Sequence, residues 1–162
     1  MMDAATQALV QDLIRQEGRS MLQYVVESFP WTTRDNEPLL LDLRQMADEE
    51  RRAAEGLAKL LLRHHARPPF LGAYPMSFTT INFVALDHLL PRLIRFQKDR
   101  VADLEASEKR ILQEDARMEV RSVLDLARRQ LTRLERLAAG ETGHADETHA
   151  PAGPALAHAP AH

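Results

Sequence analysis

The chain has 162 residues and a formal net charge of −3, a length that suits one domain with a substantial core. Three of its 24 acidic residues (Glu141, Asp146 and Glu147) follow Gly140, where there is no Lys or Arg, so the preceding part balances 21 acidic against 21 basic residues. This balance gives no electrostatic reason to expect a nucleic acid or an anionic membrane as a partner.

Cysteine is absent, which excludes disulfides and thiolate metal ligands. No apolar run approaches the roughly 18 residues of a membrane-spanning helix, and the N-terminal sequence carries too much charge for a signal peptide. We therefore expect a soluble, cytoplasmic protein of a bacterial cell.

Two amphipathic helices are predicted first. Apolar residues three and four positions apart predict a helix over 3–29, which FPWTTRDNEP ends with its two prolines. A second helix is predicted over 37–67, because Pro68 and Pro69 cannot continue it. The first helix carries a second apolar stripe, formed by Leu22, Val26 and Phe29. This surplus predicts a symmetric homodimer through these two helices.

The segment LGAYPMSFTT at 71–80 is predicted to cross over to a third helix. Thr79 or Thr80 would cap that helix, which would run to 112 with Phe83 on its buried seam and a kink at Pro91. A fourth helix is predicted over 115–139, ended by Gly140. Four long helices with one longer connection, between the second and the third, predict an all-α, antiparallel four-helix bundle over residues 1–140. A bundle without a full-length crossover is the alternative.

Two glutamates lie on the apolar seams of the first two helices. Glu17 lies between Ile14 and Met21, and Glu50 has the same place on the second helix, while Tyr24 follows Glu17 by two turns. This pattern resembles ferritins and bacterioferritins, in which the tyrosine lies beside a dinuclear iron site. The resemblance implies a ferritin-like bundle whose metals are held by one carboxylate from each of two helices and an E-x-x-H motif from each of the other two.

Several of the implied ligands are missing. Ala53 stands where the histidine after Glu50 belongs, and Ala127 and Gln130 occupy the motif of the fourth helix. No carboxylate lies near 94–97 on the third helix, and Asp87 is two turns away. We therefore predict a degenerate di-iron site, with no cofactor, in a non-catalytic, self-associating interaction or structural module.

The alternative is a metal-binding protein that oxidises, stores or carries iron or another divalent ion. Glu17 and Glu50 would bind the metal, Asp87 or Gln130 would complete the site, and Tyr24 would be the nearby redox or hydrogen-bonding residue. The simpler interpretation of the two glutamates is pairing inside the protein, because an unpaired buried carboxylate is too costly to stay charged. Arginine supplies 18 of the 21 basic residues, and Tyr24 and Gln130 can donate hydrogen bonds.

Two pairs of neighbouring residues that contain histidine have simple structural explanations. Asp87 and His88 are adjacent on a helix, so they cannot easily bind one ion, and we expect a polar network and a surface histidine there. His64 and His65 end the second helix, where a cation suits the helix dipole.

The tail, 141–162, is low in bulky residues and rich in Ala, Pro and His, so we expect it to be disordered. Its four histidines could bind a transition metal weakly; they are His144, His149, His158 and His162. Their spacing matches no closed site. The tail could alternatively dock on a protein partner, as the C-terminal peptides of encapsulin cargo do.

Overall fold

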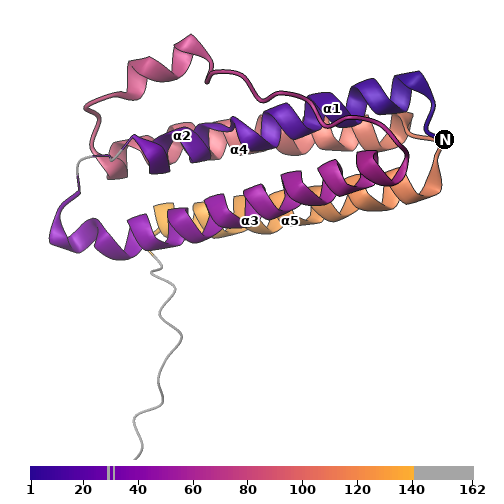
Figure 1. The fold of residues 1–162 in the computed structure, drawn as a ribbon. Helices are drawn as coiled ribbons and strands as arrows, with labels where there is room; N and C mark the ends of the chain where they lie inside the picture. Colours follow the sequence, from indigo (N-terminus) through magenta and orange to yellow (C-terminus); the bar gives the residue numbers. More distant parts are fainter. Residues whose placement is uncertain (29, 31, 141–162) are drawn as a thin grey trace, which may run out of the picture.

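The computed structural model describes residues 1–28, 30 and 32–140, and these are entirely helical apart from turns and connections, which confirms the predicted all-α class. The elements are α1 (Ala4–Gly18), α2 (Met21–Glu27), the 3-10 helix η1 (Arg34–Asn36), α3 (Glu37–Arg63), the 3-10 helix η2 (Met76–Ile81), α4 (Leu86–Arg110) and α5 (Glu114–Ala138) (Figure 1). None of the helices in this part of the chain is both long and apolar enough to cross a membrane. The predictions for the tail concern 141–162, outside the described residues.

Side-chain contacts fix the relative directions of α3 and α5. His64, at the end of α3, lies 2.6 Å from Asp115 at the start of α5. At the opposite ends of the two helices, Arg133 of α5 pairs with Asp42 of α3. The two helices are therefore antiparallel.

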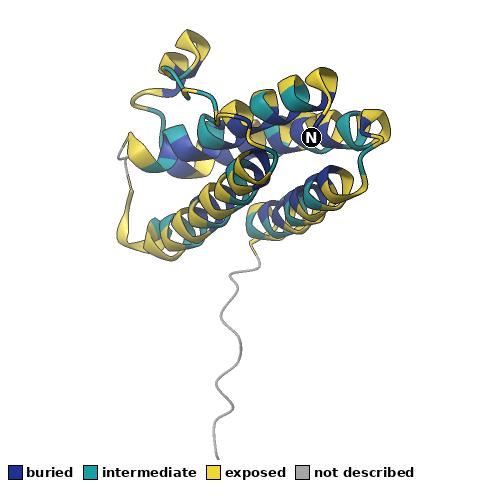
Figure 2. Cartoon of the chain, turned by 45° about the vertical axis from the view of Figure 1, so that its right-hand side comes forward, coloured by how far each residue is buried: buried dark blue, intermediate teal, exposed yellow. Residues whose placement is uncertain are grey.

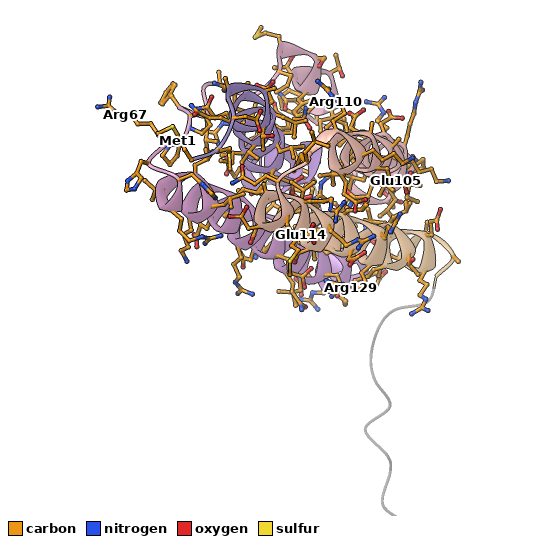
Figure 3. The ribbon with its side chains drawn as sticks, turned by 90° about the vertical axis from the view of Figure 1, so that its right-hand side faces the viewer. Met1, Arg67, Glu105, Arg110, Glu114 and Arg129 are labelled. Carbon is orange, nitrogen blue, oxygen red and sulfur yellow. The ribbon has the colours of Figure 1, made fainter. Side chains whose placement is uncertain are left out.

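Helices α4 and α5 form a hairpin. Arg110 ends α4 and Glu114 begins α5 at the end of the molecule where Met1 lies (Figure 3). Farther along, Lys98 of α4 contacts Glu135 of α5 at 3.2 Å. Because α5 is antiparallel to both α3 and α4, α3 and α4 run in the same direction. The connection between them must therefore travel back along the length of the molecule (Figure 1).

The predicted continuous helix over 3–29 is wrong, because the chain breaks it between Gly18 and Met21. Ser20 has an extended backbone, and its Oγ accepts a hydrogen bond from the amide of Gln23, which makes it the N-cap of α2. A Cβ atom at Gly18 would lie 2.9 Å from the Leu71 methyl groups, so glycine lets the connection pass close to α1. Glycine is a poor helix former and serine a strong cap, and together they favour the break.

The connection is longer than predicted, since it occupies residues 64–85. Helix α3 ends at Arg63 rather than at 67, and His65 adopts a left-handed backbone with a φ of 58°. This conformation ends helices because it turns the chain away from the helix axis.

The third long helix begins at Leu86, later than the predicted start at Thr79 or Thr80. Both threonines lie in η2 and donate to backbone oxygens three residues earlier, Thr79 to Met76 at 2.7 Å. Phe83 is 92% exposed, and its predicted place on the buried seam is wrong. Helix α4 then runs through Pro91 to Arg110 without ending.

The core consists of two apolar clusters at opposite ends of the helices, formed by the faces that the helices turn to one another (Figure 2). One contains Leu13, Leu57, Leu61, Leu104 and Leu124 among others. The second contains Leu22, Leu43, Met46, Leu89 and Leu134 among others. Of the predicted second stripe, Leu22 is 3% exposed and Val26 packs on the same cluster, whereas Phe29 lies outside the described residues.

Candidate functional site

A layer of polar side chains separates the two apolar clusters. On each long helix the buried polar residues fall between members of the two clusters, as Glu50 does between Met46 and Leu57. The layer consists of Glu17, Ser20, Gln23, Glu50, Gln97, Arg100 and Gln130. Apart from Thr6, these are all the buried polar or charged side chains of the described residues. We refer to them as the polar layer.

Arg100 of α4 is the centre of the polar layer. Its Nε donates to Oε1 of Glu17 at 2.8 Å, and its Nη2 donates to Oε2 of the same carboxylate, so the two planar groups pair side by side. Its Nη1 donates to Oε1 of Gln130 at 2.9 Å and lies 3.1 Å from Oε1 of Glu50. The three charged side chains are between 0% and 5% exposed. One guanidinium thus joins the carboxylates of α1 and α3.

Glu50 is held mainly through its second oxygen. Ser20 Oγ donates to Oε2 at 2.5 Å, and Gln23 Nε2 donates to the same atom at 3.1 Å. Gln23 also donates to the backbone oxygen of Ala47 at 2.6 Å. Oε1 accepts no hydrogen bond, because its contact with Arg100 is within ion-pair distance but is not directed along an N–H bond. Among the described residues, the only oppositely charged group within ion-pair distance of Oε1 is therefore the guanidinium of Arg100.

Burial raises the pKa of Glu50 from its ordinary 4.5 to about 7, and the charge of Glu17 adds to this increase. The charge of Arg100 and the hydrogen bonds from Ser20 and Gln23 lower the pKa in part. Burial also opposes the charge on Arg100, but the two carboxylates outweigh it and raise the pKa of that guanidinium. The buried charges therefore balance when Glu50 is protonated and Glu17 alone opposes Arg100.

Two glutamines extend the polar layer to α5. Gln130 Nε2 donates to the backbone oxygen of Met46 at 3.0 Å and to Glu49 Oε2 at 3.1 Å. Gln97 Nε2 donates to the backbone oxygen of Ala127 at 3.0 Å. The contacts therefore link α1, the start of α2, α3, α4 and α5 to one another through a single network.

The structure brings together three of the five predicted site residues. Glu17, Glu50 and Gln130 all contact Arg100. Tyr24 lies elsewhere: its hydroxyl donates to Asn82 Oδ1 at 2.7 Å, and its ring packs on aromatic side chains of the connection. Both of these contacts hold the connection against α2.

Asp87, the other proposed accessory ligand, is exposed near the start of α4. Its Oδ1 lies 3.2 Å from Nδ1 of the exposed neighbour His88, and its carboxylate takes no part in the polar layer. His64 caps the end of α3 and contacts Asp115 of α5, so this histidine joins two helix ends.

The residues present do not fit a dinuclear metal centre. A cationic guanidinium lies between the two carboxylates that would have to bridge the metals, and Ala53 and Ala127 supply no donor atom. Among the residues that the structure describes, no group of three or more His, Asp or Glu side chains could hold a metal ion.

Sequence reasoning missed Arg100, Gln97, Ser20 and Gln23. A signal for Arg100 exists, because Leu93, Gln97, Arg100 and Leu104 follow one another at spacings of four and three residues and are all buried. The predicted seam of this helix combined the buried Leu90 and Leu104 with Ile94 and Val101, which are only half-buried, and so left out Arg100.

Comparison with known proteins identifies no relative, since no family model, no curated protein and no solved structure matches this chain.

Proposed function

We propose that the chain is a ferritin-like four-helix bundle that serves as a non-catalytic, self-associating interaction or structural module. In this proposal the polar layer holds the helices in one register and binds no metal. The alternative is a metal-binding protein that uses Glu17 and Glu50. It would require the guanidinium of Arg100 to leave the space between the two carboxylates.

The directions of the helices support the ferritin-like arrangement. The pair α1 and α2 leads into the antiparallel α3, the connection 64–85 spans the length of the molecule, and α4 then runs parallel to α3. A single long crossover between the second and third long segments distinguishes this arrangement from a simple up-and-down bundle.

The observation that carries the proposal is the position of Arg100. Removing one partner from a buried ion pair leaves an uncompensated charge and destabilises a protein by about 3–5 kcal/mol. A metal ion that displaced Arg100 would impose that penalty on the guanidinium and would repel it as well. The polar layer is thus complete without a cation from solution.

Exposed apolar side chains support self-association. Besides Met1, the large apolar side chains exposed on the described surface are Leu41, Leu62, Phe70, Met76, Phe83, Leu112 and Met118. Exposed apolar residues that are scattered singly are normal, so the support comes from the three that belong to one segment, the connection: Phe70, Met76 and Phe83.

Elemental analysis of the purified, tag-free full chain tests the metal part of this proposal. We expect less than about one-tenth of a transition-metal ion per chain and a melting temperature that a strong chelator leaves unchanged, because only a ligand bound to the folded state adds to stability. A variant with alanine at His144, His149, His158 and His162 is the control for metal held by the tail.

Either of two results would contradict the proposal that the polar layer binds no metal. One is a stoichiometric metal that persists in the four-histidine variant. The other is a metal-dependent rise in melting temperature that the substitution Glu50→Gln abolishes.

A further inference from the structure

A cavity of about 560 Å³ opens between α2 and the connection, and this volume suits a small organic molecule. Three aromatic side chains line it, those of Tyr24, Tyr74 and Phe83. Among the described residues, the only charged side chain in the lining is that of Glu27, which is acidic. Aromatic faces and carboxylates both attract cations, so the walls of the cavity favour a positively charged occupant.

The hydroxyl groups of the lining are hydrogen-bond acceptors rather than free donors. The hydroxyl of Tyr24 donates to Asn82 Oδ1 at 2.7 Å, and Ser28 Oγ donates to the backbone oxygen of Val25 at 3.1 Å. Each of these hydroxyls has thus used its one proton, and its oxygen can only accept. The hydroxyl of Tyr74 is buried and has no hydrogen-bond partner among the described residues, although buried hydroxyls nearly always have one. An occupant that carries N–H donors therefore matches the lining.

The carboxylate of Glu27 is available to such an occupant. Its side chain is half-exposed, and the guanidinium of Arg51 lies 3.9 Å from it, farther than a hydrogen bond reaches. Arg51 has a closer partner in Asp48, at 2.5 Å. Burial, and then the nearby Glu27 carboxylate, raise the pKa of the Tyr74 hydroxyl. The hydroxyl therefore stays neutral beside a carboxylate that no basic side chain holds closely.

The backbone of Phe83 also indicates a ligand contact. This residue lies between η2 and α4, has a φ of 66° and is 92% exposed. A bulky residue in this left-handed region is strained, and such strain is concentrated at functional positions. The exposed ring gains little packing within the chain, whereas an occupant of the cavity would give it a surface to cover.

We propose that this cavity binds a small organic ammonium ion, a protonated amine with an aromatic or alkyl body. The ammonium group donates to the carboxylate of Glu27 and to the hydroxyl oxygen of Tyr74, and the body of the ligand packs on the aromatic rings. One contact of this kind already exists in the chain, because the guanidinium of Arg19 lies 4.8 Å from the centre of the Tyr74 ring. This inference goes beyond the proposed function and does not depend on it.

Titration of the full chain with 2-phenylethylammonium chloride, followed by amide NMR signals, tests the proposal. We expect a dissociation constant of about 1 mM or tighter, which is ordinary for so small a ligand, and signal shifts that gather around the cavity. The neutral analogue 2-phenylethanol has nearly the same shape and should bind at least about tenfold more weakly, because it lacks the charge. The cation n-hexylammonium, which has no aromatic ring, should shift the same signals.

Two variants test the proposed contacts. Glu27→Gln keeps the shape of the side chain and removes its charge, so it should weaken the binding of 2-phenylethylammonium at least about fivefold. Glu55→Gln is the matched control, since Glu55 is an exposed carboxylate of α3 that does not line the cavity. Tyr74→Phe should weaken binding about threefold without lowering the melting temperature, because the hydroxyl that it removes has no partner in the ligand-free chain.

Three results would contradict the proposal. The first is the absence of binding by both ammonium ions at about 10 mM, a concentration that reveals even weak ligands. The second is equal affinity for the amine and the alcohol, and the third is equal affinity in Glu27→Gln and Glu55→Gln. None of them bears on the proposed function, because sedimentation of the unchanged chain tests self-association and elemental analysis tests the polar layer.

Discussion

The polar layer and the two apolar clusters lie on neighbouring turns of the same helices, yet they stabilise the fold in different ways. Leu13 and Glu17 are one turn apart on α1, and both are at most 2% exposed. Leu13 stabilises the fold through the hydrophobic effect, which is not directional and depends on the apolar area removed from water. Glu17 contributes only through two hydrogen bonds from Arg100 of α4.

The two regions differ in how strictly they fix the position of each helix along its neighbours. Apolar clusters accept exchanges that conserve volume, so they allow a helix to shift slightly along its neighbours. In the polar layer nearly every bond joins different elements: Glu17 reaches α4, Glu50 reaches Ser20 before α2, and Gln130 reaches Met46 of α3. A shift of any helix would leave a buried polar group unpaired. The polar layer thus fixes the register that the apolar clusters leave open.

Among the variants that test this comparison, Arg100→Leu should have the largest effect on stability. It leaves Glu17 and Glu50 buried without a cation, and we expect the free energy of unfolding at pH 7 to fall by about 3–5 kcal/mol. Urea denaturation measures it. Arg95→Leu, at an exposed position of the same helix, is the control and should change stability by less than about 0.5 kcal/mol. A loss below about 1 kcal/mol at Arg100 would contradict the essential role of the ion pairs.

Removal of all three charges sharpens this test. The triple variant Glu17→Gln, Glu50→Gln and Arg100→Met leaves no buried ion. Its free energy of unfolding should therefore exceed that of Arg100→Leu by more than about 1.5 kcal/mol, since the stability effects of substitutions within one network do not add. If it is less stable than the single variant, the charges themselves stabilise the fold.

An apolar deletion gives the second-largest effect. Leu57→Ala, at a fully buried position of α3, should lower the free energy of unfolding by about 2–4 kcal/mol through lost burial and a cavity. Unlike that of Arg100→Leu, this loss should hardly depend on pH, because no charge is left unpaired. Urea denaturation at pH 5 and pH 8 makes the comparison, with Leu62→Ala at an exposed position of the same helix as the control.

The sequence predicted where the long helices lie better than it predicted the residues at which they begin and end. Periodic apolar residues located α3, α4 and α5, because long amphipathic patterns are the strongest local signal. The break at Ser20 depends on a cap and on Leu71, more than 50 residues away, and periodicity detects neither. The threonines before α4 have cap chemistry, but they bond within η2 instead.

For the candidate site, the sequence supplied the buried carboxylates but not their partner. Glu17 and Glu50 lie on clear apolar seams, so their burial could be predicted. Arg100 is 83 residues from Glu17, and only the packed helices bring the two together. An arginine is ordinarily exposed, so a prediction that seeks apolar residues for the buried face passes over Arg100.

The third prediction concerns the dependence of stability on pH, since protonation of Glu50 favours the folded state. Its pKa is about 7 in the folded protein and 4.5 without the surrounding structure. The folded state therefore binds more protons between these values, and the contribution of Glu50 to stability falls as pH rises through about 7. We expect a loss on the order of 1–3 kcal/mol between pH 5 and pH 8 from this group.

The variant Glu50→Gln isolates that contribution, because a neutral amide does not titrate. The free energy of unfolding of this variant minus that of the unchanged chain should rise by the same amount from pH 5 to pH 8. Urea denaturation at four or five pH values gives both curves. A constant difference would show that Glu50 keeps its ordinary pKa.

The smallest predicted effect separates a helix cap from the polar layer. Ser20→Ala removes the cap of α2 and the hydrogen bond to Glu50 Oε2, and should lower the free energy of unfolding by about 1–2 kcal/mol. Asp3→Ala is the matched control, since Asp3 caps α1 through the amide of Thr6 and has no contact with the polar layer. Because the bond from Ser20 lowers the pKa of Glu50, only Ser20→Ala should also move the pH-dependent loss to higher pH. Equal losses and equal pH profiles in the two variants would show that Ser20 acts as a cap alone.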